Sequence, residues 1–272
     1  MDPRQHHPLD LERTRYSYVE RSNRVLVGLL ERHVLRRLAA PRILDIGCGC
    51  GANAREVRRR KPGAYQLGIE PNPQAAALAA QVCDAVHVGE LASWLEQAPR
   101  ENRFDAVVLS DVLEHVADPV SFLRDLGAAP TLREAIFVIS VPNYAVWYNR
   151  VRTLVGRFDY RWSGLYDRTH LRFYTRRSVR DLLAYCGFDW LDDRCSPAIV
   201  QATAPLLRRL FERDVDAGNH LALLASPAYR FYQRVVEPIE IGACQVWPEL
   251  LGFQIVSVAR LRAPAASAPR GP

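Results

Sequence analysis

Short apolar runs alternate with amphipathic stretches between residues 42 and 142. The runs are apolar almost throughout, as expected of strands buried on both faces. The stretches between them repeat apolar residues every three or four positions, as one face of a helix requires. The pattern therefore predicts an α/β fold with a doubly wound parallel sheet covered by helices on both sides. The predicted strands are residues 42–46, 65–70, 85–88, 104–110 and 135–141, and the predicted helices are residues 53–60, 73–82, 91–97 and about 112–126.

Less regular segments flank this alternation. Residues 11–38 have helical periodicity, which Pro41 ends. After Pro142 the chain becomes rich in aromatic residues and arginine before a helix (178–186), a strand from Phe188 and a last strand (253–259). We therefore expect an N-terminal helical segment (1–40), a main domain (41–262) with two lid or cap insertions (143–175 and 197–248, the second mainly helical), and a disordered tail (263–272).

The composition is that of an ordinary folded protein, with 49% hydrophobic and 24% charged residues. We attribute the net charge of +6 to solvated helix faces. The six cysteines include no C-x-x-C pair, which argues against a zinc module or a disulfide framework. The first ten residues lack an apolar signal core, and no run of about 18 apolar residues could span a bilayer. These features predict a cytoplasmic protein with no membrane partner.

The most informative segment is a glycine-rich turn after the first predicted strand. Gly47, Gly49 and Gly51 let the backbone bend sharply and approach a ligand without a Cβ in the way. Such a turn alone also fits the loose dinucleotide fingerprint. Asp45 distinguishes a dinucleotide from a ligand with a positively charged amino group, because a carboxylate there attracts an ammonium group and repels a pyrophosphate. S-adenosylmethionine carries such an ammonium group, whereas NAD does not.

Glu70 ends the second predicted strand, 19 residues after Gly51. A carboxylate at this place can accept hydrogen bonds from both hydroxyls of a ribose, which indicates a nucleoside ligand. Dinucleotide-binding enzymes use the same device, so Glu70 does not choose between the two cofactors. The alternative interpretation is an acid that caps the helix beginning near Pro73.

A third segment, residues 104–116, ends in Ser110-Asp111-Val112-Leu113-Glu114-His115-Val116. Together with Asp45-Ile46-Gly47-Cys48-Gly49-Cys50-Gly51, it resembles the class I S-adenosylmethionine-dependent methyltransferases. The similar branch includes ubiquinone-biosynthesis O-methyltransferases and methyltransferases of saccharide and natural-product pathways. The resemblance covers residues 41–142 and, more loosely, 169–187. It implies a Rossmann-like sheet, mostly parallel with one antiparallel strand near the C-terminus, and S-adenosylmethionine as the cofactor.

The resemblance also implies which residues hold the cofactor. In that family the aspartate and glycines of the first motif hold the methionine end, and the second acid holds the ribose. Glu90 falls where the family often places an acid or polar residue beside the adenine, and the Ser110-Asp111 turn lines the sulfonium end. The implied cofactor-binding residues are Asp45, Gly47, Cys48, Gly49, Gly51, Glu70, Pro71, Glu90, Ser110 and Asp111.

Two histidines are candidate general bases for an acceptor hydroxyl. His115 follows the fourth strand, with a packing and capping role as the alternative. His170 lies in residues 166–175, which resemble the D-x-T-H-x-R-x-[FY]-[ST] segment of the same branch, with attachment of this loop to the sheet as the alternative. The candidate acceptor-binding residues are Arg168 and Arg172, for an acidic group, and Tyr144 and Tyr166 of the aromatic stretch.

We predict no metal. The alternative is a divalent cation on Asp111, Glu114 and His115, because spacings of three and four would place them on one helical face. In ubiquinone-type relatives the matching positions can bind such an ion.

These features predict methyl transfer from S-adenosylmethionine to a small-molecule acceptor, with oxygen as the expected atom and a saccharide, phenolic or natural product as the substrate. The alternatives are an RNA or protein methyltransferase and a non-catalytic partner protein that binds S-adenosylmethionine. The strand end Ser-Asp-Val-Leu and the absence of a recognisable RNA-binding module argue against nucleic acid. A dehydrogenase ranks last, because Asp45 would have no role there. A homodimer is left open.

Overall fold

A computed structural model describes residues 22–97, 103–161, 164–197 and 231–263. Its strands are β1 (Arg42–Ile46), β2 (Tyr65–Glu70), β3 (Ala85–Val88), β4 (Ala106–Ser110), β5 (Ile136–Pro142), β6 (Phe188–Pro197) and β7 (Gly252–Leu261). They form one sheet in the order β3-β2-β1-β4-β5-β7-β6. All neighbours pair in parallel except β7, which runs antiparallel to both β5 and β6. The predicted mostly parallel sheet with one antiparallel strand near the C-terminus is confirmed.

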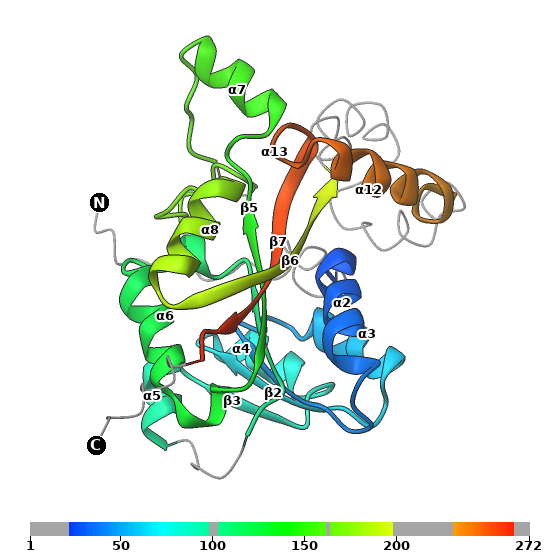
Figure 1. Ribbon diagram of the computed structural model, residues 1–272, viewed down its shortest axis with the longest axis vertical. Helices are drawn as coiled ribbons and strands as arrows, with labels where there is room; N and C mark the ends of the chain where they lie inside the picture. The colour runs from blue at the N-terminus through cyan, green and yellow to red at the C-terminus, as the bar shows by residue number, and fades with distance from the viewer. Residues whose placement is uncertain (1–21, 98–102, 162–163, 198–230, 264–272) are drawn as a thin grey trace, which may run out of the picture.

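Helices cover both faces of this sheet (Figure 1). They are α2 (Arg24–Leu30), α3 (Ala52–Arg60), α4 (Pro73–Ala79), α5 (Leu91–Gln97), α6 (Pro119–Ala128), α7 (Trp147–Leu154), α8 (Arg176–Tyr185), α12 (Glu237–Val246) and α13 (Pro248–Leu251), with short helical turns η2 (Glu31–Leu35), η3 (Leu113–His115), η4 (Pro130–Leu132) and η5 (Tyr232–Val236).

The sheet separates two hydrophobic cores, and successive residues of a strand point into opposite ones. Leu44 and Leu109 join the core that includes α5, α6 and α8, and Ile43 and Val108 join the core that includes α2 and α3. Because both faces of the central strands β1, β4 and β5 are buried, these strands are apolar almost throughout.

Within the described residues, the predicted N-terminal helix runs from Arg24 to Leu35. Asn23 has an extended backbone, and its side-chain oxygen accepts a hydrogen bond from the backbone N–H of Leu26 at 3.0 Å. This N-cap starts the helix at Arg24. The π-helical turn η2 then ends at Leu35, six residues before Pro41. Residues 11–21 of the predicted helix lie outside the described residues.

The predicted helix from about 112 to 126 is wrong in its first half. The chain forms the 3-10 turn η3, and α6 begins only at Pro119. The side chain of Asp118 accepts hydrogen bonds from the backbone N–H groups of Val120 and Ser121, both at 3.1 Å. An N-cap aspartate followed by proline at the first helical position starts a new helix here.

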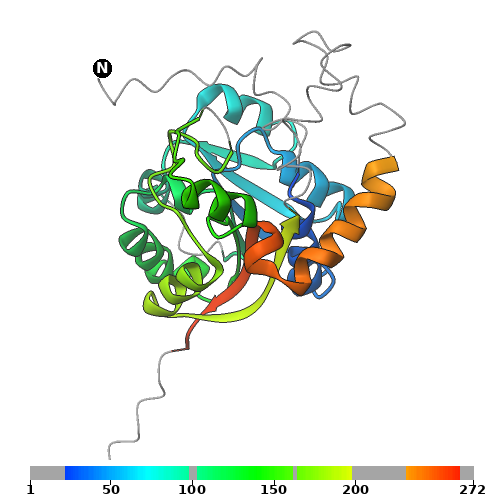
Figure 2. The ribbon, with the colours of Figure 1, turned by 90° about the horizontal axis from the view of Figure 1, so that it is seen from above.

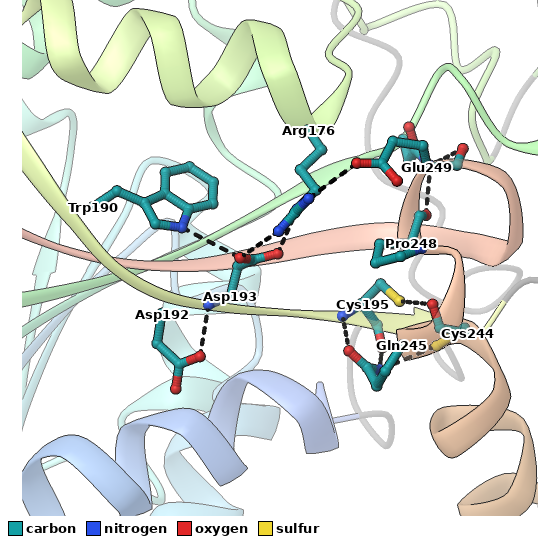
Figure 3. Close-up of polar contacts among 10 residues, drawn as sticks. Arg176, Trp190, Asp192, Asp193, Cys195, Cys244, Gln245, Pro248 and Glu249 are labelled. Carbon is teal, nitrogen blue, oxygen red and sulfur yellow. Dashed lines mark hydrogen bonds and ion pairs between the residues drawn. The ribbon is translucent and has the colours of Figure 1, made fainter.

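The elements after β5 gather at the carboxyl end of the parallel strands. Because Pro142 pairs with Gln254, α7 after β5 and α13 before β7 lie at this end, as Figures 1 and 2 show. Arg176 at the start of α8 donates two hydrogen bonds to Asp193 of β6, at 2.7 and 3.0 Å, and one to Glu249 of α13, at 3.0 Å (Figure 3). This clamp fastens three elements that are far apart in the sequence.

Helix α12 is fastened to β6 by a second set of contacts in Figure 3. The thiol of Cys195 donates to the carbonyl oxygen of Cys244 at 2.9 Å, and the side-chain amide of Gln245 donates to the carbonyl oxygen of Cys195 at 2.8 Å. Residues 198–230 of the predicted second insertion, and 264–272 of the predicted tail, lie outside the described residues. The lid roles of both insertions stay predictions.

Within the described ranges, no helix has both the length and the apolar character needed to cross a bilayer.

Candidate active site

The turn after β1 requires its glycines. Gly47, Gly49 and Gly51 have φ values of +70°, +54° and +79°, a region that L side chains rarely adopt. A Cβ on Gly51 would also lie 2.5 Å from Cγ2 of Val82, and one on Gly47 would lie 2.8 Å from Cγ2 of Val112. The glycines that the sequence singled out therefore allow both the bend and the close packing around it.

Asp45, the fourth residue of β1, is 4% exposed, and its Oδ1 atom has no hydrogen-bond partner. Burial and, to a lesser degree, the neighbouring charge of Glu70 raise the pKa of Asp45 to about 7. A buried carboxylate with an unsatisfied oxygen opposes folding unless a cation or a donor reaches it. A group kept in this state marks a ligand-binding position.

Glu70 ends β2 and holds the glycine turn from the side. One of its oxygens accepts a hydrogen bond from the backbone N–H of Gly49 and the other from that of Asn72, both at 2.9 Å. Burial nevertheless raises the pKa of Glu70, against the effect of these two bonds. The alternative of a helix-capping acid is wrong, because the N-cap of α4 is Asn72, whose side chain accepts from Gln74 and Ala75.

The remaining predicted cofactor residues lie at the same edge of the sheet. Parallel pairing sets Ile46 beside both Ile69 and Leu109, so the turns after β1, β2 and β4 meet there. Glu90 and Pro71 are exposed. Cys48 instead packs away from solvent, and a hydrogen bond with Cys83 together with burial raises the pKa of its thiol. The Cys48 side chain is therefore a packing group rather than a nucleophile.

Asp111 follows Ser110 at the end of β4 in a strained conformation, with φ at +56°. Its Oδ1 atom accepts a hydrogen bond from Oγ of Ser140 at 3.1 Å, and its Oδ2 atom accepts one from Nε2 of Gln254 at 2.6 Å. These bonds hold the backbone of the turn in place. Sequence reasoning missed Ser140 and Gln254, since no local signal links a residue to a partner 143 positions away.

Glu114, His115 and His170 form a compact cluster beside this turn. One potential metal-ligand atom from each lies within 4.8 Å of the others. The two imidazole rings meet edge to face with centroids 4.9 Å apart. The backbone N–H groups of Leu171 and Arg172 both donate to the carbonyl oxygen of Glu114, at 2.7 and 3.0 Å, which fastens the His170 segment to η3.

The electrostatics of this cluster favour uncharged groups. Glu114 is 1% exposed, both of its carboxylate oxygens lack partners, and burial, with Asp111 next, raises its pKa well above the usual value. Burial lowers the pKa of both histidines, and the charge of His170 lowers that of His115 further. Nδ1 of each ring lies 3.1 Å from a backbone carbonyl oxygen, of Thr169 and Leu165 respectively. A carbonyl only accepts, so each Nδ1 carries the hydrogen and each Nε2 keeps its lone pair.

This geometry corrects the predicted metal alternative. Asp111 does not share a helical face with Glu114 and His115, because η3 is a single 3-10 turn and both oxygens of Asp111 bind Ser140 and Gln254. The third member of the cluster is His170, 55 positions beyond His115 in the chain.

The predicted acceptor-binding residues differ in their surroundings. Arg168 is exposed, and the guanidinium group of Arg172 donates to the carbonyl oxygen of Ala117, which makes Arg172 part of the scaffold. The rings of Tyr144 and Tyr166 lie 6.4 Å apart, within an aromatic group that includes Phe158 and Phe173. Tyr166 is buried, and its hydroxyl has no hydrogen-bond partner.

Several buried polar side-chain atoms have no hydrogen-bond partner. Among the described residues, seven side-chain atoms are buried without a partner. Three of them belong to the site, namely Asp45 Oδ1 and Glu114 Oε1 and Oε2, and three belong to the segment after β5, namely Asn149 Oδ1, Arg152 Nε and Tyr166 OH. Folding does not favour such atoms, so the residues that carry them are candidates for ligand contacts. Sequence reasoning missed Asn149 and Arg152, whose burial depends on how α7 packs.

Comparison with known proteins identifies the family. A profile described as "Methyltransferase domain" matches residues 18–192, more than half of the chain. The chain belongs to the methyltransferase family. The methyltransferase is 30% identical over 158 residues to a ubiquinone biosynthesis O-methyltransferase of Azorhizobium caulinodans, covering 57% of this chain and 61% of the relative. It is 32% identical over 137 residues to the enzyme of the same name from Bradyrhizobium diazoefficiens, covering 48% and 53%. It thus spans less than two thirds of the length of these relatives.

Solved structures support the same fold. The methyltransferase resembles a SAM-dependent methyltransferase from Archaeoglobus fulgidus, with a TM-score of 0.52 and 19% identity over 88% of this chain and 94% of that one. It also resembles a putative sarcosine dimethylglycine methyltransferase from Galdieria sulphuraria, with a TM-score of 0.55 and 14% identity over 88% and 86%. At this identity the likeness shows the fold alone. The prediction of a class I methyltransferase fold is confirmed, and the family supports S-adenosylmethionine as the cofactor.

Proposed function

We propose that the methyltransferase transfers the methyl group of S-adenosylmethionine to an oxygen atom of a small-molecule acceptor. The observation that carries the proposal is the buried, unsatisfied carboxylate of Asp45 beside the glycine turn. Burial raises its pKa to about 7, because no neighbouring group of the protein stabilises the negative charge. Asp45 would bind the ammonium group of the methionine end, which would supply the counter-charge that the protein lacks here. Glu70 holds the turn and accepts the ribose hydroxyls.

The acceptor meets the methyl group near Glu114, His115 and His170. The cofactor supplies a methyl group activated by its sulfonium, so the reaction forms an oxygen–carbon bond and breaks the sulfur–carbon bond, leaving S-adenosylhomocysteine. The acceptor hydroxyl must lose its proton as this bond forms. The lowered pKa values of His115 and His170 keep both rings neutral at pH 7, and Nε2 of His170 accepts the proton.

The same cluster fits a divalent cation, although the sequence analysis favoured none. The fit rests on the two unsatisfied oxygens of Glu114 and on the Nε2 lone pairs that the Nδ1 hydrogen bonds leave on His115 and His170. A cation held there by these three residues would occupy the Nε2 lone pair of His170, and it would replace that base by lowering the pKa of the acceptor hydroxyl.

The acceptor itself is recognised by the segment after β5. The unsatisfied Arg152 Nε and Tyr166 OH are donors, and the unsatisfied Asn149 Oδ1 is an acceptor. This set suits an acceptor with hydroxyl or acidic groups. Both curated relatives are named as O-methyltransferases, so phenolic acceptors should be tested before saccharides and other natural products.

Calorimetry with S-adenosylhomocysteine and S-adenosylmethionine tests the cofactor half of the proposal. We expect micromolar binding of both and none of NADH. Heat from NADH with none from either sulfur compound would overturn the methyltransferase proposal. Binding with no turnover of any hydroxylated acceptor would favour the alternative of a non-catalytic partner protein.

The metal question has a readout that is independent of activity. Co²⁺ bound by two histidines and a carboxylate gives visible absorption bands, which titration with the full chain would reveal. We expect Glu114→Gln to abolish these bands and the exposed matched control Glu134→Gln to keep them. No bands in the unmodified protein would leave His170 as a base without a metal.

A further inference from the structure

Helix α7 carries its apolar side chains on the outside. Trp147, Val151, Leu154 and Val155 are 40%, 54%, 86% and 63% exposed, and their spacing places them on one helical face. The opposite face is polar, with the buried Asn149 and the buried Nε of Arg152. A helix on the surface of a water-exposed protein normally has the reverse arrangement. A contiguous exposed patch of this kind, on the order of a few hundred Å², marks an interaction surface.

This face lies at the same end of the sheet as the candidate active site. Helix α7 directly follows β5, and Figures 1 and 2 show it projecting beyond the carboxyl end of the sheet, on the same side as α13. Val246 and Trp247, between α12 and α13, are also exposed, at 86% and 56%. Large apolar side chains from two separate segments are therefore uncovered at this end.

The charges around α7 are almost all positive. Arg150, Arg157 and Arg161 are exposed. Asp159 is the one acidic residue between positions 147 and 161, and its carboxylate is neutralised by Arg152 at 3.1 Å. Positions 147–161 thus carry four arginines and one acidic residue, which gives the apolar face a fringe of net positive charge.

We propose that α7 docks on the surface of a membrane that contains anionic lipids. The four apolar side chains enter the boundary between headgroups and acyl chains, and the arginine fringe binds lipid phosphates. A second copy of the chain fits less well, because a stable interface buries about 800 Å² on each partner and copies of this segment would repel one another. The expectation of no membrane partner rested on the absence of a signal and of a spanning segment, and surface docking needs neither.

Vesicle flotation of the full chain tests this proposal. We expect the protein to float with vesicles of phosphatidylcholine and phosphatidylglycerol and to bind phosphatidylcholine alone more weakly. Val151→Ser/Leu154→Ser should lower the bound fraction about tenfold, because two buried aliphatic side chains are lost. Arg150→Gln/Arg157→Gln should remove the preference for anionic vesicles. Tyr185→Ser, which changes a 69% exposed side chain on α8, is the matched control and should bind normally.

Equal flotation of the unmodified protein and the Val151→Ser/Leu154→Ser variant would overturn the proposal. A concentration-dependent dimer, seen by ultracentrifugation without vesicles and abolished by that variant, would also overturn it and assign the face to a second copy. Calorimetry with S-adenosylhomocysteine shows whether each variant is folded. If the unmodified protein does not bind that ligand, the proposed function is contradicted. The flotation result still tests membrane docking, because flotation does not depend on cofactor binding.

Discussion

The carboxylate of Asp45 is buried without a partner for one oxygen, a state that an uncharged side chain of the same shape would avoid. The free energy that this charge costs the unliganded protein is the physical sign of its binding role. The glycines around it could be predicted from the sequence, because each acts through its own backbone. The positions of Ser140 and Gln254 could not, because they act on Asp111 through distant strands.

Asp45→Asn should stabilise the unliganded protein. The folded-state pKa of about 7 lies above the ordinary 3.8, so the folded state binds the proton more tightly. The free energy of unfolding therefore falls as pH rises from about 4 to 7, and the full cost of the charge, on the order of a few kcal/mol, remains above pH 7. Thermal melts should show a larger gain in Tm for the variant at pH 8 than at pH 5. A lower Tm at pH 8 would contradict this account.

Gly51→Ala and Gly156→Ala separate packing from backbone conformation. Both glycines have positive φ, at +79° and +71°, but a Cβ at Gly156 meets nothing within 4 Å. We expect Gly156→Ala to lower the free energy of unfolding by about 1 kcal/mol, and Gly51→Ala to lower it further and to abolish cofactor binding. Denaturant unfolding and calorimetry measure the two effects. Equal losses of stability with cofactor binding intact would show that the turn tolerates a side chain.

At the scale of elements, the sequence pattern predicts the five parallel strands and most of the helices because both faces of the sheet are buried. The break before α6 was missed although its signal, Asp118 followed by Pro119, is local. The meeting of His115 and His170 depends on how the segment after β5 returns to η3, and no periodicity encodes that path. For the same reason the outward apolar face of α7 could not be predicted from the sequence.

The capping box of α8 offers a test at this scale. The Thr175 side chain accepts from the backbone N–H of Ser178 at 3.1 Å, and the Ser178 hydroxyl accepts from that of Thr175 at 2.8 Å. Thr175→Ala should lower the free energy of unfolding by about 1 kcal/mol in urea, while Thr175→Ser should keep most of it. Affinity for S-adenosylhomocysteine should not change in either variant. A weakened cofactor complex in Thr175→Ala would show that α8 also positions the cofactor site.

At the scale of the whole molecule, the parallel sheet explains why one edge holds the chemistry. Residues 45, 70 and 111–115 are spread over about 70 positions, and strand pairing brings their turns together. Residue 170 joins them because the backbone N–H groups of Leu171 and Arg172 donate to the carbonyl oxygen of Glu114. The α/β fold could be predicted from the sequence alone, and the cofactor side largely followed from motifs. The acceptor side depends on the packing of α7 and the 165–172 segment, which only the structure shows.

The central claim is that Asp45 binds the ammonium group of the cofactor. Calorimetry of S-adenosylhomocysteine binding as a function of pH tests it most directly, with Glu70 as the other titrating group beside the turn. The unmodified protein should lose affinity about tenfold between pH 8 and pH 6, because protonation removes the charge. Asp45→Asn should bind about 10- to 100-fold more weakly at pH 8 and with little pH dependence. An Asp45→Asn variant that matches the unmodified protein in affinity and pH dependence would contradict the claim.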